Sequence, residues 1–508
     1  MKLEDLLERL SSSATSSTQK GSAFERLMAS YLRTAPEFAD RFEEVYLWQE
    51  WPGRGGAHDH GIDIVAKDMT TGGWCAVQCK FYDPRHHVAK GDVDSFLAAS
   101  SKKGFTSRII VSTAKDWGPT IEKQLDNLTV PVVRIGVSDL LESKVDWANI
   151  DWTRPQQVLP TTGKKTALPH QREARTAVRE GLTTHDRGQL IMACGTGKTF
   201  TSLKVAEELA TGRKAEPTTV LFLVPSIQLL NQSLREWKQE SQIPFRAYAV
   251  CSDVQVGKTN ASEDLSVHDL IYPATTDTAA LAAQIRQRTE DDQFTVVFST
   301  YQSIDVVARA QGQGMPDFDL IVCDEAHRTT GVTLAEADES HFVRVHDNTY
   351  LRGTKRLYMT ATPRLFDPNT KERAQANEAV LASMDDEAVF GPVLHRLGFG
   401  EAVERDLLTD YKVLVLTVDE AFVAQNFQQE LGASGELKLG DAAKLVGCWN
   451  GLAKRFGTDL PDGLDGVDLT PMRRAVAFAK DIKSSRPPPS PSPASSTDSG
   501  PPSTTAML

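Results

Sequence analysis

The chain has 508 residues, 40% of them hydrophobic, and a formal net charge of −12. This length and composition predict a soluble globular protein of roughly three domains. No apolar run is long enough to span a membrane and the start lacks the apolar core of a signal peptide, so we expect no membrane association and a cytoplasmic location. The acidic total argues against coating of nucleic acid by bulk charge, although it is compatible with a local basic groove. The 6 cysteines include no CxxC pair, which predicts reduced thiols and no structural zinc.

The N-terminal part of the chain reads as a helix, a linker and an α/β domain. Residues 1–20 hold a short amphipathic helix and the polar run SSSATSST, and the next helix is expected to begin near Ser22. Across residues 21–153, short apolar runs (DIVA, WCAVQCKFY, RIIVST, VPVVRI) alternate with helical stretches such as VDSFLAASSKK. This alternation predicts a compact α/β domain that ends near Trp152.

A second α/β domain is expected after a linker. Residues 154–167 are rich in Pro, Thr and Gly without periodicity, which is typical of an interdomain linker. Residues 168–398 contain buried-strand runs (GQLIMA, VLFLV, FTVVFST, DLIVCDE, RLYMTA), each followed by a loop and a helical stretch. This order predicts a doubly wound, mostly parallel sheet that binds its ligand at the carboxyl ends of the strands.

The last part of the chain contains too few strands for a third complete domain. Residues 399–483 hold two strand candidates, in LTDYKVLVLTV and RRAVAFAKDIK, and are interpreted as the start of a second sheet domain. Residues 484–508 form a low-complexity Ser/Pro/Thr segment that cannot bury a core and is expected to be disordered.

A glycine-rich loop between a strand and a helix predicts a nucleotide site. In IMACGTGKTFTSL, the two glycines allow backbone N–H groups to wrap around phosphates at a helix N-terminus. Lys198 would reach the β- and γ-phosphates and Thr199 would ligate Mg²⁺, so ATP and Mg²⁺ are the expected ligands. The alternative is a glycine-rich turn with a surface lysine, and Met192 stands where the strict pattern has glycine. The predicted ATP-binding residues of this loop are Cys194, Gly195, Thr196, Gly197, Lys198 and Thr199.

The run DLIVCDEAH predicts the other half of this site. Asp324 ends an apolar strand and would hold Mg²⁺ through water. Glu325 would orient and deprotonate the attacking water. A lone Asp-Glu pair is usually a solvated turn, but this pair caps an apolar strand downstream of the phosphate loop. Two independent half-sites together indicate ATP binding.

Two neighbouring strands of the first domain carry a second candidate site. Asp63 lies in GIDIVA, while Gln78 and Lys80 lie in WCAVQCK and share one strand face by alternation. An aspartate and a carbonyl oxygen can hold Mg²⁺, and an adjacent lysine can stabilise the charge on a cleaved phosphate. The pattern alone is weak, and the competing interpretation is a salt-bridged surface strand. Four histidines have spacings that suit no common metal site and are interpreted as loop residues: His58, His60, His86 and His87.

The segments MACGTGKT, VPSIQLL, FSTYQS, DEAH and MTATP occur in this order. In that order they resemble the first RecA-like domain of superfamily 2 helicases and translocases. The resemblance implies that Gln171 reads adenine and that His327, Thr360 and Thr362 couple hydrolysis to motion.

The same resemblance implies a nucleic-acid path across the second domain. Val224–Leu230 and Thr300–Gln302 match segments that touch the nucleic-acid backbone, through contacts that position without specifying sequence. Core packing is the alternative for Val224 and Leu229.

The first domain's candidate site resembles the Mrr-like branch of PD-(D/E)xK nucleases, in which glutamine replaces the acidic residue of the last motif. The resemblance implies that Asp63, Gln78 and Lys80 are catalytic and that Asp63 and Gln78 hold Mg²⁺. Glu25, in the preceding helix, matches the position of an additional family carboxylate.

Longer segments extend the resemblance to the single-polypeptide type ISP restriction-modification enzymes, from about Lys20 to Lys483. They include LIMACGTGKTFTSLKVAEE, VFSTYQSIDVV, IVCDEAHRTTG and SMDDEAVFGPV. The family implies a nuclease and a double RecA-like motor that translocates on double-stranded DNA and cleaves unmethylated foreign DNA. It also implies methyltransferase and target-recognition parts, which for this chain would have to be a separate product.

The chain departs from that family after RRAVAFAKDIK, where a QxxGRxxR-like segment is missing. The arginines of such a segment accelerate hydrolysis on the order of 10³-fold, so we expect very slow ATP hydrolysis. A frameshift, a truncation or a gene-model error would account for the Pro/Ser-rich tail. Two alternatives to an active nuclease and motor remain: a non-catalytic fragment that binds ATP and DNA, and a helicase subunit of a type III restriction or DNA-repair system.

Overall fold

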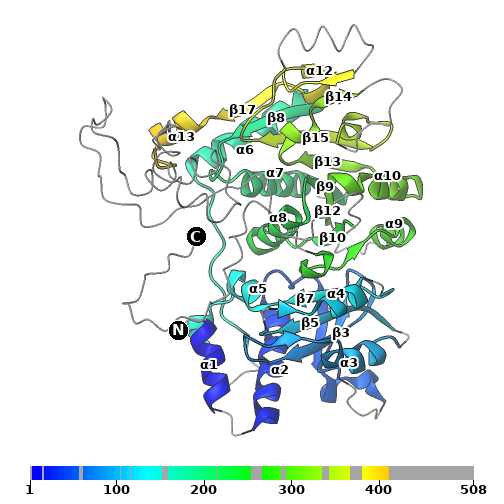
Figure 1. Cartoon of the computed structure of the whole chain (residues 1–508). Helices are drawn as coiled ribbons and strands as arrows, with labels where there is room; N and C mark the ends of the chain where they lie inside the picture. The colour runs from blue at the N-terminus through cyan, green and yellow to red at the C-terminus, as the bar shows by residue number, and fades with distance from the viewer. Residues whose placement is uncertain are drawn as a thin grey trace, which may run out of the picture. The chain divides into compact units, whose positions relative to one another are not determined.

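The computed structural model divides the chain into two units, residues 1–409 and 410–508. It describes residues 3–13, 16–55, 61–102, 104–114, 116–126, 128–150, 158–213, 216–252, 266–287, 293–333, 342–366 and 380–410. The described residues thus fall almost entirely in the first unit, which contains two α/β sheets (Figure 1). From residue 411 onward, the predicted start of a second RecA-like domain and the predicted disordered tail lie outside the described residues.

The first sheet has five strands in the order β1-β2-β3-β5-β7. Strand β2 runs antiparallel to both of its neighbours, β1 and β3, whereas β3, β5 and β7 are parallel. The strands are β1 (Phe42–Leu47), β2 (Ile64–Asp68), β3 (Gly73–Lys80), β5 (Phe105–Ser112) and β7 (Val132–Ile135), and β4 (His87–Val88) pairs separately with β6 (Asp116–Trp117). The helices of this part are α1 (Leu3–Ser13), α2 (Ser17–Thr34), α3 (Asp94–Ala99), α4 (Pro119–Leu125) and α5 (Val137–Glu142).

Side chains of β3 alternate between two cores, as predicted. Cys75 and Val77 pack with Phe24 and Leu27 of α2, and Ala76 packs with the group that contains Phe96 of α3. Both faces of this sheet are therefore covered, and Gln78, on the Ala76 face, is 2% exposed.

The N-terminal helices differ from the sequence prediction. The run SSSATSST was expected to be a linker, but α1 extends through Ser13 and α2 begins at Ser17 rather than near Ser22. Ser16 caps α2 by accepting a hydrogen bond of 3.2 Å from the backbone N–H of Gln19. Serine is a strong N-cap residue, so the polar run that resembles a linker in sequence supplies a helix start instead.

The second sheet has eight strands, all parallel, in the order β11-β10-β12-β9-β13-β15-β8-β17. All five predicted strands are present, and β10, β11 and β17 were not predicted. The strands are β8 (Arg187–Met192), β9 (Thr218–Val224), β10 (Arg246–Val250), β11 (Ala274–Thr275), β12 (Phe294–Thr300), β13 (Phe318–Cys323), β15 (Gly353–Thr360) and β17 (Val393–Leu397). A separate antiparallel pair joins β14 (Gly331–Thr333) to β16 (Val380–Ala382).

Helices cover both faces of this sheet, which confirms the doubly wound prediction. In β9, Val220 and Phe222 pack with residues of α7 and α8, whereas Leu221 and Leu223 pack with residues of α9 and α10. The helices are α6 (Pro169–Thr184), α7 (Lys198–Gly212), α8 (Ile227–Glu240), α9 (Thr278–Arg286), α10 (Ile304–Gly312), α12 (Glu387–Phe390) and α13 (Phe399–Glu404). Within the described ranges, no helix is long and apolar enough to cross a membrane.

Short 3-10 helices punctuate the loops of both parts. They are η1 (Trp48–Glu50), η2 (Pro52–Arg54), η3 (Lys90–Asp92), η4 (Trp147–Asn149), η5 (Val267–Asp269), η6 (Tyr301–Ser303), η7 (Ala326–Thr329) and η8 (Arg344–His346). Two of them, η6 and η7, directly follow the strands β12 and β13 and shape the edge of the sheet where its ligand is expected.

Residues 158–167, the described part of the predicted linker, contact both α/β domains. Leu159 is 1% exposed, and its backbone N–H lies 3.3 Å from the Thr34 hydroxyl at the end of α2. Lys165 donates its backbone N–H to the carboxylate of Glu240, at the end of α8, over 2.6 Å. This segment is therefore hydrogen-bonded to the first and to the second α/β domain.

Candidate functional site

The predicted phosphate loop connects β8 to α7. Gly195 and Gly197 adopt positive φ angles of 83° and 89°, a conformation that favours glycine. A Cβ atom on Gly197 would lie 2.3 Å from the side-chain nitrogen of Gln171. Lys198 begins α7, and its ammonium group lies 3.3 Å from the carbonyl oxygen of Met192. The lysine is thus folded back over the loop, where it would meet the phosphates of a nucleotide.

Two side chains at the start of α6 hold this loop from behind. Gln171 donates to the carbonyl oxygen of Thr196 over 3.0 Å, and its own side-chain oxygen accepts from the Leu168 N–H over 3.0 Å. The ring of His170 contacts the same Thr196 oxygen at 2.9 Å. Sequence reasoning missed His170, although it precedes Gln171 directly. Both ends of the Gln171 amide are engaged here, and its contact with adenine stays a prediction.

The second half-site lies at the end of β13. Asp324 is 5% exposed, and burial, followed by the charge of Glu325, raises its pKa to about 6, against the lowering effect of Lys198. The Asp324 carboxylate accepts the backbone N–H of Glu325 over 3.0 Å. Glu325 itself has a φ of 48°, a left-handed conformation that non-glycine residues adopt mostly where function requires it. The structure thus brings the phosphate loop and the Asp-Glu pair together.

The residues predicted to couple hydrolysis to motion form one hydrogen-bonded group beside Glu325. The Nδ1 atom of His327 lies 3.3 Å from the Glu325 carboxylate and 3.1 Å from the Thr360 hydroxyl. The backbone N–H of Thr362 donates to the same hydroxyl over 3.1 Å. Burial lowers the pKa of His327, with the Glu325 charge opposing it, which favours a neutral ring. Their coupling role stays a prediction, but the contacts that it requires are present.

The segments predicted to touch nucleic acid contain both core and surface residues. Val224 and Leu230 are fully buried, and Leu229 is partly buried against the same core, so core packing accounts for them. Gln302 is exposed and donates to the Pro225 carbonyl oxygen over 3.3 Å. The two segments therefore lie side by side at one edge of the sheet, which is the arrangement that a shared backbone contact needs.

The candidate nuclease site lies between β2 and β3. Asp63 immediately precedes β2, and its carboxylate accepts the backbone N–H of Cys79 over 2.7 Å. Gln78 donates its side-chain N–H to the carbonyl oxygen of Gly61 over 2.9 Å. The remaining side-chain oxygen of Gln78 is buried and has no hydrogen-bond partner among the described residues. Gln78 is 2% exposed and Asp63 is partly buried, which does not fit the alternative of a salt-bridged surface strand.

Glu25 and Lys80 belong to the same neighbourhood. The rings of Phe24 in α2 and Phe81 after β3 pack with centroids 5.2 Å apart, which brings the middle of α2 to the end of β3. Burial raises the pKa of the Cys79 thiol well above its usual value, the charges of Asp63 and Glu25 raise it further, and Lys80 opposes them. Three of the four predicted residues, Asp63, Glu25 and Lys80, therefore lie close enough to Cys79 to affect its ionisation.

These residues fit the magnesium ion that the sequence implies. A buried acceptor without a partner is costly unless an ion or water satisfies it, and Mg²⁺ prefers carboxylate and amide oxygens together with several waters. Among the described residues, no cluster of three or more His, Cys, Asp or Glu is arranged to hold a metal. Asp63 and Gln78 would therefore supply few protein ligands, which suits Mg²⁺ better than zinc.

The described histidines do not join this site. His86 lies 3.3 Å from the Asp92 carboxylate, and His87 begins the short strand β4. His58 and His60 lie outside the described residues. His86 is thus paired with Asp92 and not with the candidate metal ligands Asp63 and Gln78.

Comparison with known proteins assigns both parts of the chain to families. Residues 33–157 match an Mrr-type catalytic domain family described as "Restriction endonuclease". Residues 164–365 match the family described as "Type III restriction enzyme, res subunit". The boundary between the matches falls in the segment that joins the two sheets.

The chain covers only part of the length of each relative. The structure of "ATP-dependent Type ISP restriction-modification enzyme LlaBIII bound to DNA" is 36% identical, with a TM-score of 0.79, over 96% of this chain and 30% of that chain. A nuclease-deletion mutant of the type ISP enzyme LlaGI in complex with a DNA substrate mimic is 33% identical, with a TM-score of 0.38, over 57% of this chain and 28% of that chain. A "Probable helicase" of African swine fever virus (isolate Tick/South Africa/Pretoriuskop Pr4/1996) is 30% identical over 48% of this chain and 23% of its own length. The chain therefore carries an Mrr-like restriction endonuclease domain followed by a restriction-type helicase domain, and it is similar in structure to part of a type ISP restriction-modification enzyme.

Proposed function

We propose that this chain is the nuclease and motor part of a restriction enzyme, which uses ATP to move on double-stranded DNA and Mg²⁺ to cleave it. The observation that carries the proposal is the presence of two candidate residue sets in one unit of the chain. Lys198, Asp324 and Glu325 gather at the carboxyl ends of the parallel strands, and the set around Cys79 lies in the domain ahead of them. The similarity to LlaBIII, which extends over 96% of this chain, supports the same combination.

In the proposed nuclease, the chain's own residues orient the ion and the phosphate. Asp63 and Gln78 would hold Mg²⁺, which supplies a more acidic water and neutralises charge on the phosphate when bound. The hydrogen bond from the Cys79 N–H fixes the Asp63 carboxylate, and the Gly61 contact fixes the Gln78 amide. Lys80 would stabilise the charge that develops on the cleaved phosphate, and Glu25 would position water at the same site.

In the proposed motor, the phosphate loop would bind the nucleotide and the Asp-Glu pair would support its hydrolysis. The loop N–H groups and Lys198 would bind the β- and γ-phosphates, while Thr199 and Asp324 would hold the Mg²⁺ of the nucleotide. Glu325 would orient the attacking water and accept its proton. The contact of His327 with both Glu325 and Thr360 gives a route by which loss of the γ-phosphate alters the loop after β15.

A helicase subunit without nuclease activity is the second candidate, and the match of residues 164–365 to a type III res subunit favours it. The two candidates differ at Gln78. A helicase subunit gives no reason for a buried side-chain oxygen of Gln78 without a partner among the described residues, whereas a metal-dependent nuclease does.

The test is Mg²⁺-dependent cleavage of unmethylated plasmid DNA by the full chain, with and without ATP. Asp63→Ala should abolish cleavage because it removes a metal ligand, and Lys198→Ala should remove only its dependence on ATP. Asp317→Ala, which changes an exposed carboxylate outside both sites, is the matched control and should cleave normally. ATP binding without cleavage by the parent chain would contradict the nuclease assignment and favour a non-catalytic fragment.

A further inference from the structure

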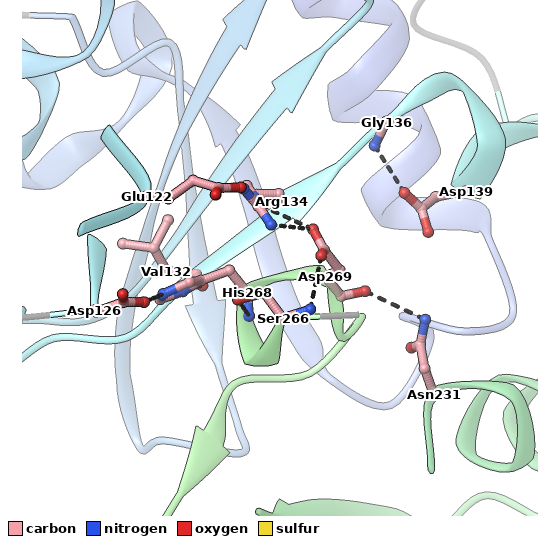
Figure 2. Close-up of polar contacts among 10 residues, drawn as sticks. All are labelled: Glu122, Asp126, Val132, Arg134, Gly136, Asp139, Asn231, Ser266, His268 and Asp269. Atoms are coloured by element: carbon pink, nitrogen blue, oxygen red, sulfur yellow. Dashed lines mark hydrogen bonds and ion pairs between the residues drawn. The ribbon is translucent and has the colours of Figure 1, made fainter. Parts of the chain in front are cut away.

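Buried polar contacts join the nuclease domain to the motor around η5. Arg134 of β7 lies 3.1 Å from Glu122 and 2.7 Å from Asp269 of η5, so one guanidinium pairs with a carboxylate of each domain (Figure 2). The ring of His268 contacts the carbonyl oxygen of Val132 at 2.9 Å and the carboxylate of Asp126 at 3.1 Å. Asp269 and His268 thus dock one short motor segment onto the nuclease sheet.

Helix α8 of the motor holds this segment and adds contacts of its own. The Asn231 side chain donates to the backbone carbonyl of Asp269 over 3.2 Å, and Arg235 donates to the carboxylate of Asp139 over 2.6 Å. Lys238 pairs with Asp40 at 2.7 Å. These α8 residues recur at i, i+4 and i+7, so they form one stripe along the helix. Each is between 4% and 7% exposed, and Arg235 and Lys238 pair with carboxylates of the nuclease domain.

The neighbouring face of α8, about 100° around the helix, contacts the predicted nucleotide site. Leu230, Leu234 and Trp237 are fully buried in the motor core, and the Trp237 indole N–H donates to the carbonyl oxygen of Thr199 over 3.1 Å. At the end of the helix, the Lys204 ammonium of α7 donates to the carbonyl oxygen of Glu240 over 3.0 Å. The helix that follows the phosphate loop is therefore hydrogen-bonded to α8 at two points.

The nuclease residues that α8 contacts are connected to the candidate nuclease site through regular structure. Asp139 belongs to α5, and its carboxylate also accepts the backbone N–H of Gly136 over 2.8 Å, directly after β7. Strand β7 pairs with β5, and β5 pairs with β3, which carries Gln78 and Lys80. Movement of α8 would therefore act on the end of the sheet that holds these residues.

Polar chemistry at this interface is informative because packing alone does not require it. Burial raises the pKa of Asp139 and lowers that of Lys238, and their partners Arg235 and Asp40 oppose these shifts. Buried ion pairs are weak sources of stability compared with apolar packing, but they fix orientation because their hydrogen bonds are directional. The ion pairs of the α8 stripe therefore fix the orientation of the nuclease domain on the motor more than they stabilise the interface.

We propose that α8 couples the nucleotide site to the nuclease domain, with Arg235 as a positioning residue of the nuclease that acts through Asp139. The proposal rests on the proposed function, because it requires that the phosphate loop bind ATP. Occupation of the loop displaces α8 through Thr199 and Trp237, and α8 reorients α5 through Arg235. Coupling between two binding events is reciprocal, so the manner in which the nuclease docks must also change the affinity for nucleotide.

The reciprocal effect provides the test. Affinity for a fluorescent, slowly hydrolysed ATP analogue with Mg²⁺ is measured on the full chain, on Arg235→Met and on the control Arg134→Met. The two arginines are matched, because their side chains are 5% and 7% exposed and each pairs with a carboxylate across the interface. Arg235→Met should weaken nucleotide binding by about fivefold or more, the lower end of typical couplings. Arg134→Met should change it by less than about twofold, because its motor partner does not lie on α8.

A second measurement keeps the proposal testable if Arg235→Met does not fold. Hydrogen exchange of the α5 backbone is followed in the parent chain and in Trp237→Phe, which removes the N–H that reaches Thr199 and keeps a smaller aromatic ring in the core. Nucleotide should alter exchange at residues 137–142 of the parent and leave it unaltered in Trp237→Phe. Equal effects of the two arginine variants, or no nucleotide effect on α5 in a parent chain that binds the analogue, would overturn the coupling proposal alone. A parent chain that does not bind the analogue would overturn the proposed motor function and the coupling with it.

Discussion

Replacement of Asp324 by asparagine should stabilise the ligand-free chain while abolishing its Mg²⁺-dependent nucleotide binding. Burial, together with the charge of Glu325, raises the pKa of Asp324 from 3.8 to about 6. Each pKa unit corresponds to about 1.4 kcal/mol, so at neutral pH the charged carboxylate lowers the free energy of unfolding by about 3 kcal/mol as an upper limit. Asparagine removes the charge, and its side-chain oxygen can still accept the Glu325 N–H that lies 3.0 Å away.

The sign of the effect gives it a characteristic pH dependence. Below about pH 4 the carboxyl is protonated in the folded and the unfolded chain, so aspartic acid and asparagine should be equally stable. Between about pH 4 and pH 6 the unfolded chain releases the proton first, and the folded chain loses stability relative to it. Above about pH 6, where the raised pKa of Asp324 lies, the full difference is present. The advantage of Asp324→Asn should therefore appear as pH rises and become constant above pH 6.

Thermal unfolding between pH 4 and pH 8 measures this advantage. For a domain of 150–250 residues, about 1 kcal/mol shifts Tm by roughly 2–4 °C, so the gain should reach up to roughly 10 °C at pH 8. Mg²⁺ with an ATP analogue should reverse the order, because at 1,000 times its Kd a ligand stabilises the parent alone by about 4.1 kcal/mol, which exceeds the advantage of the variant. Glu404→Gln, which removes the same charge from an exposed position, should show neither effect. The reasoning is refuted if Asp324→Asn is less stable than the parent at pH 8 or if its advantage is the same at pH 4.5.

Two further predictions concern single residues of the two sites. Gly197→Ala should destabilise the chain by about 2–3 kcal/mol and weaken nucleotide binding more than tenfold, because alanine disfavours the positive φ and its Cβ displaces the Gln171 amide 2.3 Å away. Denaturant unfolding and nucleotide titration measure this, and Gly212→Ala, whose Cβ would meet nothing within 4 Å, is the control that should behave like the parent. Gln78→Met should leave the free energy of unfolding within about 1 kcal/mol of the parent, because the lost Gly61 hydrogen bond is offset by removal of a buried acceptor without a partner. The same variant should lose the increase in Tm that Mg²⁺ gives the parent in the absence of nucleotide, and an unchanged response to Mg²⁺ would contradict the assignment of Gln78 as a ligand.

Much of the fold was predictable because short-range patterns and packing agree. The five apolar runs of the second domain become parallel strands, since strands buried on both faces are apolar throughout. In β3, the period of two separated Cys75 and Val77 from Ala76 and Gln78, and the two cores keep that division. The glycines of the phosphate loop were identifiable because their positive φ angles suit few other residues.

The interface between the domains was not predictable, because a helix face has the same sequence whether water or protein covers it. The stripe of Asn231, Arg235 and Lys238 on α8 resembles an ordinary solvated face, yet all three side chains are buried, two of them paired with carboxylates of the other domain. The spacing of i, i+4 and i+7 was visible, but nothing local distinguishes the carboxylates of Asp139 and Asp40 from other surface acids. The linker prediction for residues 11–18 was wrong for a related reason, because the sequence does not distinguish a serine that caps a helix from a serine in a linker.

Burial also explains why an amide suits position 78. A glutamate in the place of Gln78, which is 2% exposed, would be desolvated, and desolvation favours the protonated form of a carboxyl group. A protonated carboxyl is a poor ligand for Mg²⁺, so such a residue would bind the ion only at the expense of losing its proton. The Gln78 amide presents a carbonyl oxygen that does not depend on pH, and its N–H on Gly61 fixes the direction of that oxygen. An amide in place of an acid thus attracts Mg²⁺ less strongly, but it stays correctly oriented and able to bind the ion in a buried site.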